Sequence, residues 1–154
     1  MKFKIICGFK NKQGNFKDFE AQILKRISSH YSLEIEEISL SNKIKKDQIK
    51  TEQSKLLANK LTPGAFHIIL TEHGKMFSSK DIAQLIETQQ INSIKQIEFV
   101  IGGPYGIDPN QFKSSSLFLS ISSMTFTSEL CRLILIEQLY RAVSIIKNLP
   151  YHKE

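Results

Sequence analysis

The segment "FVIGGPYGIDP", residues 99–109, decides how this chain is interpreted. An apolar run typical of a buried strand ends in two glycines, and a third glycine and two prolines follow within seven residues. Glycine at the end of a strand allows a ligand or another stretch of main chain to approach closely. A tight structural turn explains this composition about as well as a bound ligand does, so both interpretations stay open at this point.

Strands and helices alternate along the chain. Strands are predicted over 2–9, 33–40, 65–72, 96–103 and 116–122, and helices over 16–30, 47–61, 78–90 and 128–147. This alternation is typical of an α/β fold with a largely parallel sheet and helices on both faces. Alternating apolar and charged residues in 33–40 place that strand at a sheet edge. Ser78 or Ser79 is expected to cap the third helix.

Length and composition predict one soluble domain that spans residues 1–154. Of the 154 residues, 41% are hydrophobic and 23% are charged. No apolar run approaches the ~18 residues that a membrane span needs, and the N-terminus lacks the features of a cleaved signal peptide. We therefore expect a cytoplasmic protein without a membrane partner.

The two cysteines, Cys7 and Cys131, are far apart and belong to no Cys-x-x-Cys or Cys/His cluster. Neither a disulfide framework nor a metal site is indicated. Both thiols are expected to be free and buried, because free cysteine is among the most buried residue types.

The net charge of +6 lies entirely in the first part of the chain. Residues 1–60 contain 13 Lys and Arg against 7 Asp and Glu, whereas residues 61–154 contain 8 of each. The densest basic segment is "NKIKKDQIK", residues 42–50. Such a patch attracts the phosphates of a nucleic acid, but a solvated helix face is the simpler explanation of the patch taken alone.

Three strand ends are candidates for a ligand site, because ligands of open α/β sheets bind outside the carboxyl ends of the strands. These ends are Leu70, Gly102-Gly103 and residues 121–126. The glycine spacing is GGxxG rather than GxGxxG, and Pro104 prevents a helix from starting directly after the strand. No GxxxxGK[ST] motif is present either. The pattern favours a ligand such as an adenosine without a polyphosphate.

The last helix, predicted over 128–147, has apolar side chains around most of its circumference. A helix at the rim of a small domain needs a single apolar stripe. A homodimer joined through this helix is therefore expected, and burial beneath the chain itself is the alternative. Glutamate at Ile134 or at Leu135 is expected to break such a dimer.

Four motifs occur in an order that resembles a known family. These are "IGGPYG" (101–106), "LSISSMT" (119–125), "EQLYRA" (137–142) and "PYHKE" (150–154). Together they resemble the ribosomal RNA large subunit methyltransferase H family, which belongs to the SPOUT class of S-adenosylmethionine-dependent RNA methyltransferases. The resemblance covers essentially the whole chain.

The resemblance implies a fold, a partner and an activity. Members of the family have an α/β domain whose C-terminal part forms a deep trefoil knot, and they act as homodimers. They methylate N3 of a pseudouridine in helix 69 of 23S ribosomal RNA, on assembled ribosomes. The implied cofactor is S-adenosyl-L-methionine, and no metal is implied.

The resemblance also implies site residues. The cofactor pocket is expected to use Leu70, Gly102, Ile121, Ser122, Ser123, Met124, Thr125 and Phe126. Valine at Gly102 is expected to fill the space of the adenosine. For the transfer step, Arg141 would stabilise negative charge on the imide, His152 would accept its proton, and Tyr151 would orient the histidine or stack on the base. His73 is the reserve candidate, His67 is expected to be structural, and His30 to lie on the surface.

Two departures from the family pattern leave alternatives open. Where the family usually reads TLPHxL, this chain reads "TFTSEL" (125–130), so that Thr127 and Ser128 replace a Pro-His pair. The family's LDxxGK becomes "LTEHGK", with Thr71 in place of the acid and Glu72 one position later. A catalytically impaired ribosome-associated SPOUT protein and a SPOUT methyltransferase directed at transfer RNA are the alternative functions.

Overall fold

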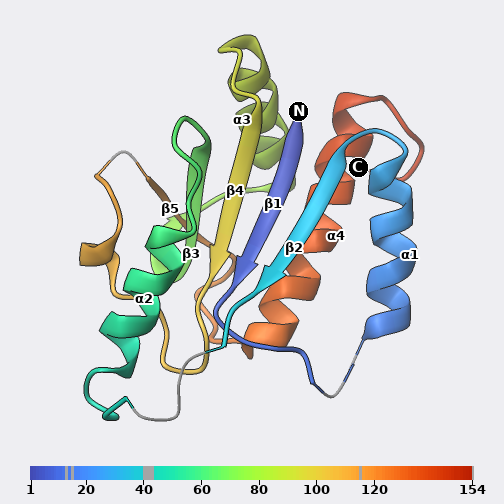
Figure 1. The fold of residues 1–154 in the computed structure, drawn as a ribbon. Coiled ribbons are helices and arrows are strands. Elements are labelled where there is room, and N and C mark those ends of the chain that lie inside the picture. The colour runs from blue at the N-terminus through green and yellow to red at the C-terminus, as the bar shows by residue number, and fades with distance from the viewer. Residues whose placement is uncertain (13, 15, 40–43, 115, 154) are drawn as a thin grey trace.

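A computed structural model describes residues 1–12, 14, 16–39, 44–114 and 116–153, so positions 42–43 of the basic segment and position 154 of the tail lie outside it. Five strands and four α-helices alternate around a single sheet (Figure 1). The strands are β1 (Lys2–Cys7), β2 (Ser32–Glu37), β3 (Phe66–Met76), β4 (Gln96–Ile101) and β5 (Leu117–Ser120). The helices are α1 (Lys17–Ser28), α2 (Ile49–Asn59), α3 (Ser79–Ile91), α4 (Ser128–Ile146) and the short 3-10 helix η1 (Pro109–Gln111).

The sheet has the strand order β2-β1-β4-β3-β5, and every neighbouring pair is parallel. The predicted α/β class and the edge position of β2 are thus confirmed, although the strand ends at Glu37 rather than at residue 40. In contrast, β3 continues four residues past its predicted end at residue 72. A register shift lets both Leu70 and Lys75 pair with Leu119. Gly74 makes this possible, because a Cβ there would lie 2.5 Å from the Leu119 main chain.

Each face of the sheet buries its own apolar cluster, which explains why β1 and β4 are continuously apolar in their second halves, over 5–7 and 99–101. On one face, Ile5, Ile68 and Phe99 pack beneath α1, α3 and α4. On the other face, Ile6 and Val100 belong to a smaller cluster beneath α2 and η1. Helices on both faces, as the sequence predicts, therefore cover the sheet unequally (Figure 1).

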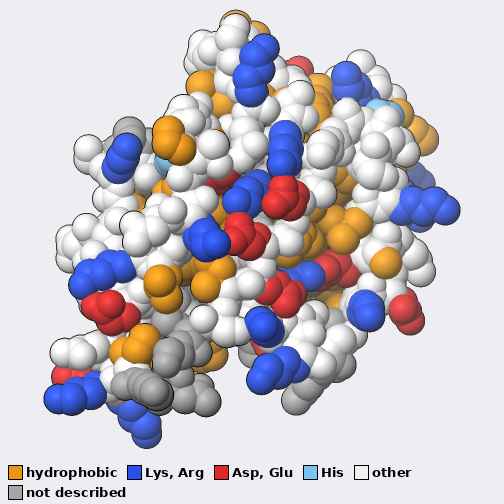
Figure 2. Space-filling view, viewed as in Figure 1, with side chains coloured by type: hydrophobic (Ala, Val, Ile, Leu, Met, Phe, Trp, Pro, Cys, Tyr) orange, Lys and Arg blue, Asp and Glu red, His pale blue; other side chains and the backbone are white. Residues whose placement is uncertain are grey.

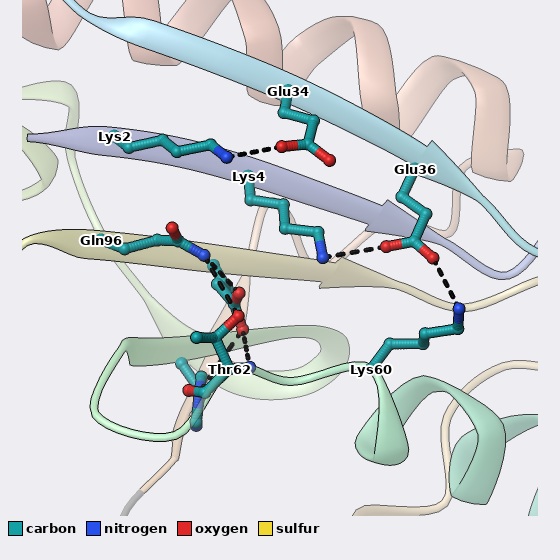
Figure 3. Close-up of polar contacts among 9 residues, drawn as sticks. Lys2, Lys4, Glu34, Glu36, Lys60, Thr62 and Gln96 are labelled. Carbon is teal, nitrogen blue, oxygen red and sulfur yellow. Dashed lines mark hydrogen bonds and ion pairs between the residues drawn. The ribbon is translucent and has the colours of Figure 1, made fainter.

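The part of the second face that α2 leaves open carries ion pairs across the strands (Figure 3). Lys2 Nζ lies 2.6 Å from a Glu34 carboxylate oxygen. The Glu36 carboxylate forms ion pairs with Lys4 Nζ at 2.9 Å and with Lys60 Nζ at 3.0 Å. Hydrogen bonds from Lys4 and Lys60 lower the pKa of the Glu36 carboxyl. In Figure 2 positive and negative side chains are interspersed over this part of the molecule.

Beside these pairs, Glu98 is completely buried and depends on hydrogen bonds. Its carboxylate accepts the Thr62 main-chain N–H at 2.9 Å and the Gln96 side-chain amide at 2.6 Å. His67 Nε2 lies 3.0 Å from the Thr62 carbonyl oxygen and 3.5 Å from Glu98. His67 is therefore a structural histidine, as the sequence predicts.

The helix starts follow local chemistry. The Ser78 hydroxyl caps α3 by accepting the Asp81 main-chain N–H, and the Asp81 carboxylate accepts the Ser78 main-chain N–H, so that a capping box is complete. Thr127 caps α4 by accepting the Leu130 main-chain N–H.

Of the two free cysteines, Cys7 is buried as expected, whereas Cys131 is only half-buried.

Candidate cofactor cleft and C-terminal cluster

A cleft of about 710 Å³ lies at the carboxyl ends of the strands. Three segments form its walls: the residues from Leu70 to His73 in β3, the loop 102–107 after β4, and residues 120–128 between β5 and α4. Because β4 and β3 are adjacent and β3 pairs with β5, the sheet order brings these three strand ends together. The predicted meeting of the three strand ends thus occurs in the folded chain.

Most of the predicted cofactor residues line this cleft. They are Leu70, Gly102, Ile121, Ser122, Met124, Thr125 and Phe126. Ser123 lies in the same loop but does not line the cleft. Their role in cofactor binding stays a prediction.

The glycine pair is explained by packing within the protein. A Cβ at Gly102 would lie 2.9 Å from Ile107 and 3.0 Å from the Gly106 main chain. A Cβ at Gly103 would lie 2.6 Å from the Gly8 carbonyl oxygen. A side chain at Gly102 would therefore collide with the 102–107 loop itself, and the expectation that it would also occupy ligand space stays a prediction. Gly102 can contribute only main chain to the cleft.

The two departures from the family pattern both make contacts at the cleft. Ser128 donates its hydroxyl to the Gly102 carbonyl oxygen at 3.0 Å, and Thr127 caps α4. Thr125 donates to the Glu72 carboxylate at 3.2 Å. These hydrogen bonds tie residues 125–128 to both other walls, so the loop is anchored without a Pro-His pair.

Sequence reasoning missed four other residues of the cleft, which are Phe9, Lys50, Glu129 and Cys131. Lys50 belongs to the basic segment and is the second residue of α2, and Cys131 lies one turn into α4. Burial raises the pKa of the Cys131 thiol, so it stays protonated at neutral pH. Cys131 follows Thr127 by four positions, a spacing that places two residues on the same side of a helix. This spacing was the feature of the sequence that could have identified Cys131. His73, the reserve candidate, lines the cleft and is exposed, and His30 is exposed as predicted.

A second group of candidate residues gathers near the end of α4. Tyr151 folds back so that its ring lies 4.5 Å from Tyr140 and its hydroxyl donates to Glu137 at 3.0 Å. Arg141 donates to the same Glu137 carboxylate at 2.5 Å and lies 5.0 Å from the Tyr151 ring. The Glu137 hydrogen bond raises the pKa of Arg141, while burial and then Glu137 raise the pKa of Tyr151. We call these four residues the C-terminal cluster.

His152 follows this cluster and differs from it in one respect. Both ring nitrogens are buried, yet neither has a hydrogen-bond partner among the residues that the structure describes. Buried polar atoms in folded proteins nearly always have a partner. The imidazole is therefore positioned to accept or donate a hydrogen bond that this chain's described residues do not supply.

The cleft and the C-terminal cluster lie far apart within one chain. Ser128 begins α4 at the cleft, and Arg141 is 13 positions further along the same helix. At ~1.5 Å per residue this separation is about 20 Å along the helix axis. In Figure 1 the C-terminus lies at the upper end of α4, whereas the strands point toward the opposite end. A single chain therefore does not bring Arg141, Tyr151 and His152 to the cleft.

The fold and the cleft define an open α/β protein with a candidate ligand site at the carboxyl ends of its strands, and comparison with known proteins gives its family. Residues 1–152 match the family described as predicted SPOUT methyltransferases. The chain belongs to this SPOUT methyltransferase family. It is 33% identical to the ribosomal RNA large subunit methyltransferase H of Desulforamulus reducens, with 99% of each protein covered. It is 35% identical to the protein of the same name from Flavobacterium psychrophilum, with both chains covered completely.

Solved structures show the same fold at low sequence identity. A methylase family protein from Neisseria gonorrhoeae superimposes with a TM-score of 0.55 at 11% identity, covering 90% of this chain and 81% of that one. A second methylase family protein, from Haemophilus influenzae, gives 0.51 at 12% identity, with coverages of 99% and 70%. These similarities extend to the fold alone.

Two further observations concern the described part of the chain. No helix in it is long and apolar enough to span a membrane. It also contains no group of three or more His, Cys, Asp or Glu side chains suited to hold a metal ion.

Proposed function

We propose that this protein transfers a methyl group from S-adenosyl-L-methionine to N3 of a pseudouridine in helix 69 of 23S ribosomal RNA, on assembled ribosomes in the cytoplasm. The observation that carries the proposal is the cleft at the strand ends, whose predicted lining residues come together in a chain of the SPOUT methyltransferase family. Full-length relatives named ribosomal RNA large subunit methyltransferase H support the substrate class. A basic N-terminal half suits an RNA partner.

The cleft fits an adenosine-containing cofactor. Its volume of about 710 Å³ lies within the range of about 300–1,000 Å³ that is usual for small-molecule sites. Leu70, Ile121 and Phe126 provide apolar surface, and the 102–107 loop offers main-chain hydrogen-bonding groups next to it. When bound, the cofactor supplies an activated methyl group on a sulfonium.

The residues of the C-terminal cluster and its neighbour would handle the nucleotide. Arg141 keeps donors free after it pairs with Glu137, because a guanidinium has five N–H groups, and it would stabilise negative charge on the imide. His152 would accept the imide proton, since its ring nitrogens have no partner among the described residues. Tyr151 would hold the tail in place through Glu137. Neither step needs a metal.

We further propose a homodimer in which the tail of one subunit meets the cleft of its partner. The separation of about 20 Å along α4 supports this, as does the outward face of that helix. On this face Leu130, Leu133 and Ile134 are half-buried and belong to neither apolar cluster of the chain. A second copy would cover this surface and complete the site.

The deep trefoil knot that the family implies is also part of this proposal. The match of residues 1–152 to the SPOUT methyltransferase family supports it. Pulling the chain from its two ends tests the knot. A knotted chain stops extending short of the full contour length, whereas an unknotted one reaches it.

Cofactor binding is tested by calorimetry with S-adenosylmethionine and its demethylated product. Ser122→Trp places an indole in the cleft and should abolish binding, whereas Ser29→Trp, at the exposed end of α1, should not. Gly102→Val is a poor probe because it would distort the 102–107 loop. Equal affinity of folded Ser122→Trp and wild-type protein would remove this cleft from the proposal.

The substrate is tested by mass spectrometry of the helix 69 nucleotides from cells with and without this gene. We expect a methylated pseudouridine only when the gene is present. Methylation of transfer RNA instead, or cofactor binding without any methylation, would replace the proposal with one of the two alternatives. The anchoring of the 125–128 loop by Ser128 favours an active enzyme over an impaired one.

A further inference from the structure

The start of the 102–107 loop is held by a buried glutamine on α2 that does not itself line the cleft. Gln53 is 2% exposed. Its side-chain Nε2 donates to the Gly8 carbonyl oxygen, at the end of β1, and its Oε1 accepts the Gly103 main-chain N–H at 3.0 Å. A carbonyl can only accept and an N–H can only donate, so these partners determine which way the amide points.

The Gln53 side-chain amide replaces one main-chain hydrogen bond between β1 and β4. The last main-chain bond between β1 and β4 runs from the Gly8 N–H to the Ile101 carbonyl oxygen, at 2.8 Å. In a parallel ladder the next bond would join the Gly103 N–H to the Gly8 carbonyl oxygen. Gln53 binds both of these groups instead. The two glycines are required because a Cβ at either would lie within 3.0 Å of Gln53 side-chain atoms.

The same helix also holds the other end of the loop. Ser54 is fully buried, and its hydroxyl accepts the Asp108 main-chain N–H at 2.8 Å. Thr51 donates to the Asp108 carboxylate at 3.2 Å. α2 therefore fixes Gly103 and Asp108, between which the loop follows the wall of the cleft.

We propose that Gln53 is a positioning residue for the cofactor: by bridging Gly8 and Gly103 it sets the main chain of the 102–107 loop, and cofactor affinity depends on both of its hydrogen bonds. The identity of the ligand rests on the proposed function, whereas the bridge itself does not. Loss of either bond would leave a main-chain group buried without a partner, and the loop would move to relieve it.

Gln53→Glu tests the bridge through its pH dependence. A carboxylate accepts the Gly103 N–H but repels the Gly8 carbonyl oxygen, whereas a protonated carboxyl can donate to that oxygen. At pH 8 we expect the affinity for the demethylated cofactor product to fall by about tenfold or more. The affinity should recover toward pH 5, because burial favours the protonated carboxyl. Dividing by the wild-type affinity at each pH cancels the titration of neighbouring groups such as Lys50, Glu52 and Asp108.

Two further variants provide the comparison. Gln53→Met keeps the approximate shape without hydrogen bonds and should bind weakly at every pH. Gln89→Glu alters the other buried glutamine of the described chain, on α3, and should leave binding unchanged relative to wild type. Wild-type affinity in Gln53→Glu at pH 8, or a loss of affinity that does not change with pH, would overturn the proposal.

Hydrogen exchange separates this proposal from the proposed function. The Gly103 amide should exchange slowly in wild-type protein and at least tenfold faster in Gln53→Met, while amides of β1 and β4 keep their protection. If wild-type protein binds no demethylated cofactor product, the proposed function fails. The exchange measurement alone then tests whether Gln53 holds the Gly103 main chain. A Gly103 amide that exchanges equally fast in both proteins would contradict the bridge.

Discussion

Arg132 shows how one buried charge connects three elements. Its side chain is 7% exposed and donates to both carboxylate oxygens of Glu20 on α1, with one distance of 3.0 Å, and to Glu37 at the end of β2 at 2.5 Å. Burial opposes the charge on the guanidinium, but the hydrogen bonds to Glu20 and Glu37 outweigh it and raise the pKa of Arg132. The hydrogen bonds to Glu20 and Glu37 thus keep Arg132 charged in its buried position, where it joins α1, β2 and α4.

Arg132→Met is expected to lower the free energy of unfolding by about 3–5 kcal/mol, because two carboxylates remain without their buried partner. Urea denaturation measures this change. Lys25→Met, at an exposed position near the end of α1, is the control and should change stability by less than ~0.5 kcal/mol. Adding Glu20→Gln to Arg132→Met should restore part of the loss. A single Arg132→Met variant as stable as wild type would contradict the structural role.

Cys7 gives the free energy of unfolding a defined dependence on pH. Burial, as the largest effect, raises the pKa of the Cys7 thiol from 9.0 to about 12. The folded protein therefore holds this proton at pH values at which the unfolded chain releases it. The contribution of Cys7 to stability is complete below pH 9 and decreases as pH rises toward 12. In urea denaturation, wild type should lose stability relative to Cys7→Ala across that range, and parallel curves for the two proteins would contradict the prediction.

At the scale of elements, α4 has two roles that its sequence combines. Leu135, Leu139 and Val143 are buried in the main apolar cluster of the chain. Ile134 and Leu133 are half-buried and belong to neither cluster. Burial beneath the chain itself, the alternative to a dimer, thus accounts for only part of the apolar circumference. Part of it is covered by the chain itself, and the remainder forms the proposed dimer surface.

Ile134→Glu is expected to convert the proposed dimer into a folded monomer, because a charge would enter the apolar subunit contact. Light scattering at micromolar concentration measures the mass, and circular dichroism confirms the fold. Leu135→Glu, which the sequence favoured equally, is the wrong probe, since Leu135 is 3% exposed in the core and its charge would unfold the chain. A wild-type protein that is already monomeric would refute the proposed dimer.

At the scale of the whole molecule, the length of α4 separates the cleft from the C-terminal cluster. Whether two subunits share one active site therefore depends on how they pack. The cleft lies at the start of this helix and the C-terminal cluster near its end. An active site within one chain would require the tail to cross about 20 Å. In a two-fold symmetric dimer, each cleft can receive the tail of the other subunit.

Mixed dimers test this arrangement directly. One subunit lacks residues 151–154 and the other carries Ser122→Trp, and two affinity tags isolate the mixed pair. In the proposed arrangement the intact cleft of the first subunit meets the intact tail of the second, so mixed dimers should regain roughly half of the wild-type methylation of ribosomes. Each homodimer should be inactive. Inactive mixed dimers would place cleft and tail of the active site in one chain.

Within the tail, His152→Ala should lower the rate of methyl transfer by roughly 10²–10⁴-fold if the imidazole acts as general base. Cofactor affinity should stay close to that of wild type, because His152 does not line the cleft. Single-turnover kinetics on ribosomes measure the transfer rate. Wild-type rates in a folded His152→Ala dimer would exclude the role, and an effect on ribosome binding alone would assign the tail to RNA contact.

The sequence by itself determined the alternation of strands and helices, the largely parallel class of the sheet, the edge position of β2 and a serine cap at position 78 or 79. These follow from local periodicity and side-chain chemistry, which neighbouring residues carry. Only the tertiary structure decided why Gly102 and Gly103 are glycines, because a Cβ at either position would collide with Gly106, Ile107, Gly8 or Gln53. The Gln53 bridge, the Arg132 ion pairs and the distance between cleft and tail were likewise beyond the sequence. Each joins residues that are distant along the chain, and their spatial relation exists only once the sheet has formed.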